Sequence, residues 1–342
     1  MRPTEIVVSL QVFTGLQLSG LDPGAIVRCI ASRSCWVLLV GVVLTLFASV
    51  TLMVSQFMLE KRSIVELRDA GVVVSLGERV GGLRGWLFRI REASVTKTGG
   101  DFDFRAASRL RGLTVLELDS VAIQGSCASD LGRMRGLTTI SISRMDVPAE
   151  VWESIGRLPN IEMVMIADTN FGRHEARQLV GMRRLKVLFI DGCAITPETA
   201  VYLGGLEQLQ WLMLSNSPVE SHVIRELSRL PKPFDLELIG CELRGDVFEH
   251  MYEMRALRKL SLIATDFGSH DIENISRALS IEALMLRNRG ISLDDESLNK
   301  LGEISELRSL SLNKGLFPES ALAAFREANP HVRIDIEGQR SQ

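Results

Sequence analysis

The stretch that decides the fold is residues 185–208, which read LKVLFIDGCAITPETAVYLGGLEQ. It opens with an apolar-x-x-apolar-x-apolar block made by Leu185, Leu188 and Ile190, and the same block returns every 24 residues. On this grid the blocks open at Leu113, Leu137, Ile161, Leu185, Leu209, Leu257 and Ile281, with Pro233 at the one remaining grid point. Two more blocks, opening at Leu307 and His331, follow two residues out of phase.

Self-similarity at this period, with this apolar pattern, is typical of leucine-rich-repeat solenoids. One such unit cannot bury its apolar side alone, and stacked units make the core continuous. The predicted fold class is therefore α/β, a solenoid with a parallel β-sheet on its concave face and short helices on its convex face. The sheet should be parallel because a crossover follows every strand.

Within a unit, the block ends as a strand and the second half has helical spacing. Leu188 and Ile190 occupy alternate positions of the strand. We therefore expect both to point into the core and the residues beside them to point outward. Thr196 is suited to cap the following helix and Pro197 to its first position. Leu203 and Leu206, three residues apart, would then lie on one face of the helix.

The second feature is an uncharged run from Ser34 to Leu59, in which Trp36–Met58 is dominated by Val, Leu, Met and Phe. Roughly 20 apolar residues span a bilayer as a helix, so the run predicts one transmembrane helix ahead of the solenoid. A secretory signal peptide and a buried core helix are the alternatives; the long mixed lead and the length of the run disfavour both. Two basic residues precede the span and three follow it, which leaves its orientation open.

These features divide the chain into five predicted parts: an N-terminal lead (1–34), a transmembrane helix (35–59), a juxtamembrane segment and N-terminal cap (60–112), leucine-rich repeats (113–338) and a tail (339–342).

The cap has a pattern of its own, because solenoids need atypical end units over the exposed core. We expect a helix from Glu60 to Ala70, ended by Gly71, then a strand from Val72 to Leu76 and a second helix from Leu83 to Ile90.

With these motifs in place, the chain resembles the single-pass, membrane-anchored leucine-rich-repeat proteins of bacteria. The resemblance rests on the uncharged run, the charged helix and small strand after it, and repeats of the form L-x-x-L-x-L-x-x-T-x-I. Ile161–Phe171 and Leu257–Phe267 keep the threonine, as Thr169 and Thr265. The resemblance covers roughly residues 33–338 and implies a binding module with no catalytic residues.

The functional signal lies at the third and fifth residues of each block, which the repeat leaves free and which point to the concave side. In the three repeats that open at Ile161, Leu185 and Leu209, these positions are all large and apolar: Met163, Met165, Val187, Phe189, Trp211 and Met213. A contiguous apolar patch of this kind usually marks an interaction site. We name these six residues the apolar block and expect them to form the partner-binding site, with Trp211 and Phe189 as anchors.

The block is localised. Ile239, Ile263 and Met285 extend it, whereas the equivalent positions Thr139, Ser141, Lys259 and Ser261 are polar. Acidic residues form its rim: Glu117, Asp119, Asp191, Asp235 and Glu237. Two other interpretations are open at this stage, that the cap or the lead folds across the block, or that it is surface without a function.

Enzyme chemistry has little support. No nucleophile-elbow, phosphate-loop or zinc-protease motif occurs, and His174, His222 and His270 recur every second repeat, too far apart to share a metal. Cys193 and Cys241 are likewise two repeats apart, beyond disulfide reach. We therefore expect no enzyme, no cofactor and no metal, and a net charge of −3 does not favour nucleic acid.

The predicted function is a membrane-anchored recognition module that binds a protein or peptide on its concave face. Two alternatives remain: a structural scaffold of an envelope assembly, and a substrate-recognition subunit of a larger complex.

Overall fold

The computed structural model describes residues 33–69, 72–76, 90–96, 104–110, 112–288 and 291–337. The chain divides into two compact units, Met1–Arg62 and Ser63–Gln342. We describe each unit by itself.

In the first unit the described residues are helical. They belong to α3 (Arg33–Asp69), a continuous helix of 37 residues whose last turns lie in the second unit. The predicted helix from Glu60 to Ala70 is thus part of α3 up to Asp69. Within the described part of the chain, no helix combines the length and the apolarity that a bilayer crossing requires.

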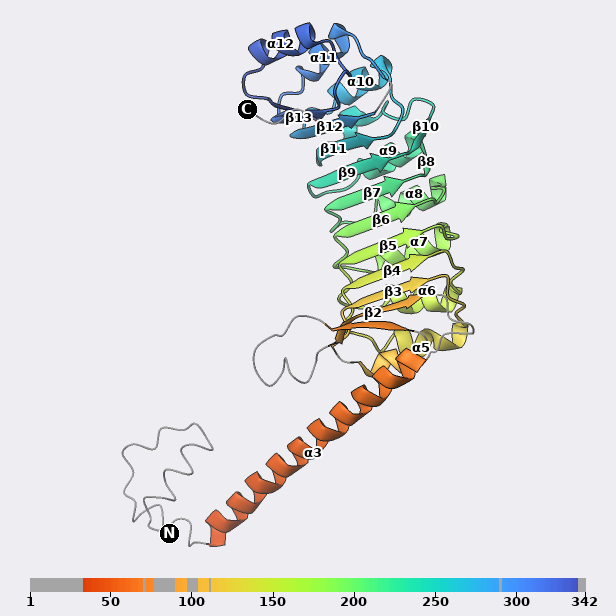
Figure 1. The fold of residues 1–342 in the computed structure, drawn as a ribbon, viewed down its shortest axis with the longest axis vertical. Helices are drawn as coiled ribbons and strands as arrows, with labels where there is room; N and C mark the ends of the chain where they lie inside the picture. Colours follow the sequence, from red (N-terminus) through yellow and green to blue (C-terminus); the bar gives the residue numbers. More distant parts are fainter. Residues whose placement is uncertain are drawn as a thin grey trace, which may run out of the picture. The chain divides into compact units, whose positions relative to one another are not determined.

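The second unit is built on one 12-stranded sheet in which neighbouring repeats lie side by side (Figure 1). Its strands, in sheet order, are β1 (Val73–Leu76), β2 (Ile90–Thr96), β3 (Val115–Asp119), β4 (Thr139–Ser143), β5 (Met163–Ala167), β6 (Val187–Asp191), β7 (Trp211–Ser215), β9 (Phe234–Ile239), β11 (Leu257–Ile263), β12 (Ala283–Arg287), β13 (Ser309–Leu312) and β14 (Arg333–Ile336). From β2 to β14 every pairing is parallel, as the repeat pattern predicts.

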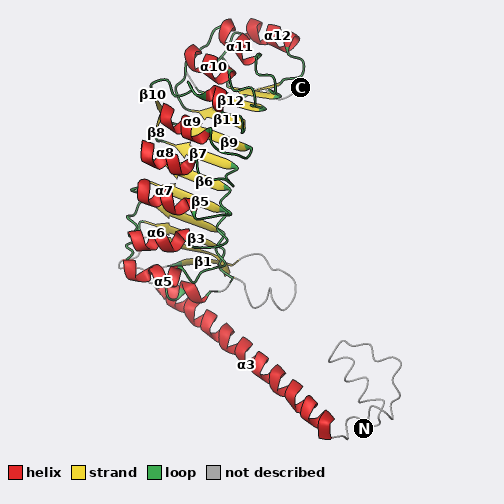
Figure 2. Ribbon diagram, turned by 180° about the vertical axis from the view of Figure 1, so that it is seen from behind, coloured by secondary structure: helices red, strands yellow, loops and turns green. Residues whose placement is uncertain are grey.

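Short helices cover one face of this sheet (Figure 2). They are α5 (Ala128–Leu131), α6 (Ala149–Gly156), α7 (Arg173–Val180), α8 (Pro197–Leu203), α9 (Ser221–Leu227), α10 (Ser269–Ser276), α11 (Asp295–Leu301) and α12 (Glu319–Ala328), with 3-10 turns η1 (Ala107–Arg109), η2 (Gly125–Cys127) and η3 (Met251–Glu253). The second unit is therefore a leucine-rich-repeat solenoid, and this part of the predicted fold is confirmed.

The core lies between the sheet and these helices. Leu188 and Ile190 are both 0% exposed, while Val187 and Phe189 beside them are partly exposed. The register pairs Leu188 with Leu212 and Ile190 with Leu214, each 24 residues further on. The apolar columns of the sequence are thus stacked columns of the core, and burial of this kind stabilises a fold by about 25 cal/mol per Å² of apolar surface.

Local signals start the helices where the sequence places them. The Thr199 backbone N–H donates to Thr196 Oγ1 at 3.3 Å, and Pro197 begins α8. At α7 the start is a glycine instead, and the Gly172 N–H donates to the Glu175 carboxylate at 2.9 Å. Each device supplies a partner for a backbone N–H that the helix itself leaves without one.

One repeat departs from the prediction of a helix on the convex side of every unit. After β9 the chain forms only the 3-10 turn η3, preceded by β10 (Glu242–Arg244), which pairs in parallel with β8 (Pro218–Glu220) in a second, two-stranded sheet. Gly245 has a φ of +71°, which turns the chain out of β10. Val247, Phe248 and Met251 are then fully buried in this turn and fill the space of the missing helix.

The N-terminal cap also differs from expectation. β1 pairs antiparallel with β2, and β2 pairs in parallel with β3, so a reversed strand ends the sheet on this side. The predicted helix from Leu83 to Ile90 is wrong at Ile90, which begins β2, because pairing with Leu76 of β1 outweighs the helical spacing. Its other residues lie outside the described residues. Phe104, Leu67 and Val72 complete the core here and are at most 3% exposed.

A turn in the left-handed backbone region ends seven successive strands. The residues are Ser120, Arg144, Asp168, Gly192, Asn216, Gly240 and Ala264. The next residue in the Gly192 and Gly240 repeats is a buried cysteine, and both cysteines are free thiols, as predicted. The Cys193 N–H donates to Ser217 Oγ at 3.2 Å, and the Cys241 N–H donates to Thr265 Oγ1 at the same distance. Hydroxyls of the following repeat thus satisfy these buried amides.

Because the helices stack closely, we expect substitutions of two glycines in equivalent positions to change stability differently. Gly204 and Gly132 both cap helices with nearly the same backbone angles, but a Cβ on Gly204 would lie 2.3 Å from the Glu226 carbonyl oxygen. At Gly132 the nearest atom would be 3.5 Å away. We expect Gly204→Ala to lose about 1–3 kcal/mol of unfolding free energy by overpacking, and Gly132→Ala to be neutral or slightly stabilising. Urea unfolding of the two variants checks this, and equal stabilities would contradict the packing described.

Candidate functional site

The sheet register brings the six predicted residues together. The pairing of β5, β6 and β7 aligns them in two rows of three, the first made of Met163, Val187 and Trp211, the second of Met165, Phe189 and Met213. All six alternate with buried core residues on their strands, so they lie on the concave face. The apolar block is therefore a real cluster in space.

The block is less exposed than the sequence suggests. Each of its side chains falls between buried and exposed, and none is among the largely exposed hydrophobic residues. The reason is that adjacent strands are only about 4.8 Å apart, so large side chains of neighbouring strands cover one another, also between the two rows. The Phe189 and Trp211 rings meet edge to face with their centroids 5.1 Å apart, a geometry that aromatic pairs favour.

Polar residues stop the block on both sides. In the same two rows, β4 contributes Thr139 and Ser141, and β9 contributes Asp235 and Glu237. The block is thus three strands wide, as predicted. Of the expected extensions, Ile239 and Ile263 pair with each other in a third row at the ends of β9 and β11, and Met285 pairs with Ser261 in the second row, beyond Glu237. None of the three is continuous with the block.

Three cations around the block are each held by an acidic partner. Lys186 Nζ lies 2.9 Å from Glu162 Oε2, and Lys259 Nζ lies 2.6 Å from Glu237 Oε1. Arg144 forms an ion pair with Asp119 across neighbouring repeats. These pairs neutralise the basic groups of this part of the concave face.

Two carboxylates of the rim form no ion pair among the described residues, although Lys259 lies opposite Asp235 in the register of β9 and β11. Neither Glu117 on β3 nor Asp235 on β9 makes a side-chain hydrogen bond or ion pair among the described residues, whereas Asp191 accepts a hydrogen bond of 2.8 Å from the neutral Asn216 side chain. Burial raises the pKa of Asp235, and the nearby Glu237 and Glu282 add to the effect while Lys259 opposes it. An ionised Asp235 is therefore a cost to the folded state.

Unsatisfied donors gather at the same end of the block. Trp211 Nε1 and Ser261 Oγ are both buried without a hydrogen-bond partner among the described residues. Trp211 pairs with Asp235 in the first row, and Ser261 pairs with Glu237 in the second. A buried polar group without a partner costs about 1–3 kcal/mol. Trp211 Nε1 and Ser261 Oγ thus lack the hydrogen-bond partners that most buried polar groups of the fold have.

A hollow separate from the apolar block lies at the edge of the sheet where the strands begin. Its volume is about 740 Å³, and its lining includes the largely exposed side chains Tyr252 and Leu279 together with Arg255. Two other arginines of the lining are neutralised, Arg258 by Glu282 and Arg277 by Glu273. The hollow is the main rival to the apolar block, and the sequence columns gave no signal for it.

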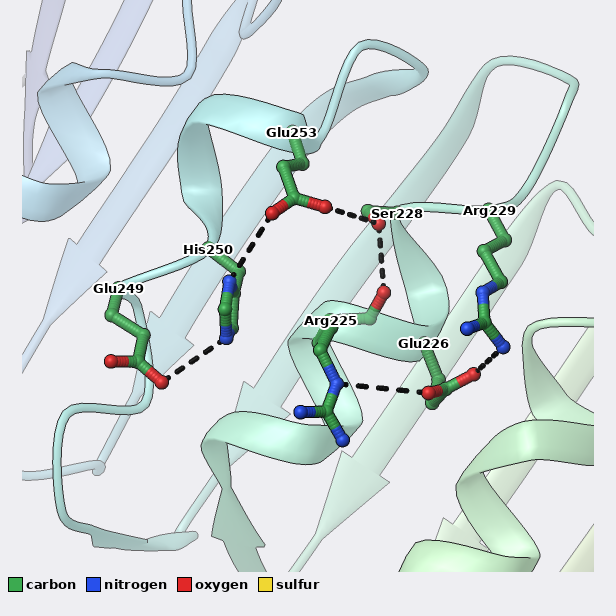
Figure 3. A network of polar contacts seen from close by, with 7 residues as sticks. All are labelled: Arg225, Glu226, Ser228, Arg229, Glu249, His250 and Glu253. Atoms are coloured by element: carbon green, nitrogen blue, oxygen red, sulfur yellow. Dashed lines mark hydrogen bonds and ion pairs between the residues drawn. The ribbon is translucent and has the colours of Figure 1, made fainter.

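A polar network on the convex side is structural rather than functional in character. Figure 3 shows Glu226 between two arginines, and His250 between two glutamates. Ser228 Oγ donates to the Arg225 carbonyl at 2.7 Å and lies 3.5 Å from Glu253 Oε2, so the network joins the end of α9 to η3. It ties the irregular repeat to its neighbour. Among the described residues no group of His, Cys, Asp and Glu is arranged to hold a metal ion.

The three histidines of the repeat column stay apart. His174, His222 and His270 are the second residues of α7, α9 and α10. His174 and His270 are exposed, whereas the His222 side chain is only 12% exposed. Its Nε2 lies 3.0 Å from the Ile195 carbonyl oxygen.

Comparisons with known proteins add little to this picture. No protein-family model and no curated protein matches the chain. Among solved structures, an internalin C2 of Listeria monocytogenes is similar at 15% identity and a TM-score of 0.42, covering 61% of this chain and 83% of that one. An internalin (inlF) of the same species matches at 12% identity and a TM-score of 0.38, covering 73% and 87%. Similarities of this level carry no functional argument.

The uncompensated carboxylate predicts a stability effect with a defined pH dependence. Because the folded-state pKa of Asp235 is raised, its ionised form destabilises the fold above that pKa, and the cost disappears as the pH falls below the unfolded value of about 3.9. We expect Asp235→Asn to melt at a higher temperature than the wild type at pH 7. The difference should shrink towards pH 4. Thermal unfolding followed by circular dichroism measures both, and a lower melting temperature at pH 7 would argue against a desolvated carboxylate.

Proposed function

We propose that the solenoid binds a protein or peptide through the apolar block on its concave face. The observation that carries the proposal is the block itself, two rows of three large apolar side chains with an aromatic pair at their centre. At the same positions the neighbouring strands carry Thr139, Ser141, Asp235 and Glu237.

The side chains of the block suit an interface core. Trp, Phe and Met are enriched in such cores, and a few aromatic anchors supply most of the binding energy, about 2 kcal/mol or more each. All six side chains retain exposed surface that a partner would remove from water. Hydrophobic gain on binding scales with that surface.

The scaffold supports the same reading. The block stands on three adjacent strands of a continuous parallel sheet whose inward residues are buried. Side chains that are already held by their neighbours lose little further freedom on binding, so less of the interaction energy is spent on ordering. The edge-to-face contact between Phe189 and Trp211 is an example of such prior order.

We further propose that residues 35–59 anchor the chain in a membrane as a single pass. The support comes from the sequence, in which the uncharged run from Ser34 to Leu59 exceeds the roughly 20 residues that a bilayer needs. Basic residues follow it at Lys61 and Arg62.

Binding is testable with a displayed library of random peptides selected against the full-length chain in detergent. We expect peptides to be enriched on the wild type and to lose binding to the double variant Phe189→Ser with Trp211→Ser. Leu279→Ser, which removes an exposed apolar side chain in the rival hollow, should bind them as the wild type does. Fluorescence polarisation of the enriched peptides gives the affinities.

Two outcomes would defeat the assignment. Enriched peptides that bind the double variant unchanged, or that depend on Leu279, would place the site elsewhere. A library without enriched peptides would favour the alternative in which the repeats only space or stiffen an assembly. Circular dichroism melting of each variant separates loss of binding from loss of fold.

Anchoring is tested by two charges placed in the run. Leu46→Arg together with Val50→Arg should shift the protein from the carbonate-resistant membrane fraction to the aqueous one, because each arginine at the centre of a spanning helix costs about 2.5–3.5 kcal/mol. Val65→Arg, an exposed position of α3 outside the run, is the control. A wild-type protein found in the aqueous fraction would remove the anchor from the proposal.

A further inference from the structure

The apolar block lies between two carboxylates, Glu117 and Asp235, that form no ion pair among the described residues; Lys259 lies opposite Asp235, but its ammonium is paired with Glu237. Asp235 follows Trp211 directly in the first row, on the strand beside it. On the other side, Glu117 pairs with Ser141, which pairs with Met165 in the second row. A segment crossing the strands through the block would thus meet a negative charge at each end.

The charged side chains around the apolar block do not balance one another, and the excess charge is negative. Within strands β3 to β11 and the turns beside them, the basic side chains Arg144, Lys186 and Lys259 near the block already hold acidic partners. The carboxylates of Glu117 and Asp235 form no ion pair among the described residues. The unneutralised charge around the block is therefore negative, and complementary charge is what selects partners at an interface.

The spacing of the two carboxylates sets a length. From β3 to β9 there are five strand-to-strand steps in the sheet, and at about 4.8 Å each they span about 24 Å. An extended chain advances by about 3.3–3.6 Å per residue. A segment of about seven residues would therefore reach from Glu117 to Asp235.

We propose that the ligand is an extended peptide segment with an apolar centre and a basic residue at each end, lying across β3 to β9. Its Lys or Arg side chains meet Asp235 beside Trp211 and Glu117 beyond Met165, and its apolar residues cover the two rows of the block. This inference rests on the proposed function and specifies its partner. An apolar segment with acidic ends is rejected at the same surface, because it would add like charge to both carboxylates.

The environment of Asp235 agrees with such a partner. Partial burial holds its pKa above the ordinary value, and Trp211 Nε1 and Ser261 Oγ nearby are buried without partners. This end of the block therefore carries polar groups that cost stability in the free protein. A cation seated on Asp235 places opposite charge on that carboxylate, whereas the Trp211 Nε1–H is a donor and needs an acceptor, such as a backbone carbonyl of the peptide.

The test compares peptides and variants in one experiment. A displayed library of random seven-residue peptides is selected on the full-length wild-type chain, and the enriched peptides are sequenced. Each is then synthesised with its basic residues kept or replaced by glutamate. We expect Lys or Arg towards both ends, and affinity that falls with salt. Asp235→Asn and Glu117→Gln should each weaken binding by about tenfold, while Glu327→Gln, a charge removal at an exposed site on α12, should change nothing.

The outcomes separate this inference from the proposed function. Peptides that need Phe189 and Trp211 but carry no basic ends, or that bind Asp235→Asn and Glu117→Gln as tightly as the wild type, would overturn the inference and leave the proposed function standing. Peptides that ignore Phe189 and Trp211 would overturn both. Melting curves of the two charge variants show whether any loss comes from misfolding.

Discussion

The fold depends on the stacking of inward apolar side chains, one column upon another, at intervals of 24 residues. Leu188 packs beside Leu212 and Ile190 beside Leu214 because the strands that carry them are parallel and in register. No single unit could bury its own apolar side. This packing forms the stack. Helix caps and turns add to it, and so do the hydrogen bonds by which hydroxyls of the next repeat satisfy buried amides.

The same register determines the outer surface. Once alternate residues of each strand point inward, the others must point outward, and they too align into rows. Six large apolar side chains occupy two such rows in only three repeats. The core therefore positions the apolar block without any of its members contributing to the inward columns, and the block is free to vary for binding.

The convex face is irregular in the repeat after β9. Where β10 and η3 replace a convex helix, bulky side chains such as Phe248 turn inward, and the network around His250 and Glu226 connects the two sides of the irregularity. On the concave side the neighbouring strand β9 carries Asp235, the partly buried carboxylate that ends the apolar block. Specificity on this surface thus comes from a few polar residues at the margin of an apolar centre.

From the residues alone it is possible to determine the period, the strand of each repeat, the helix of each repeat except the one after β9, the cap at Thr196 and the membership of the apolar block, because all of these follow from spacing along the chain. Only the tertiary structure decides what depends on neighbours 24 residues or more away. It shows that packing between rows half-buries Trp211, that β1 pairs antiparallel, and that Lys259 forms its ion pair with Glu237 and not with Asp235, which lies opposite it. The physical reason is that a repeat pattern specifies which way a side chain points, whereas exposure and charge pairing depend on the particular side chains that stacking brings beside it.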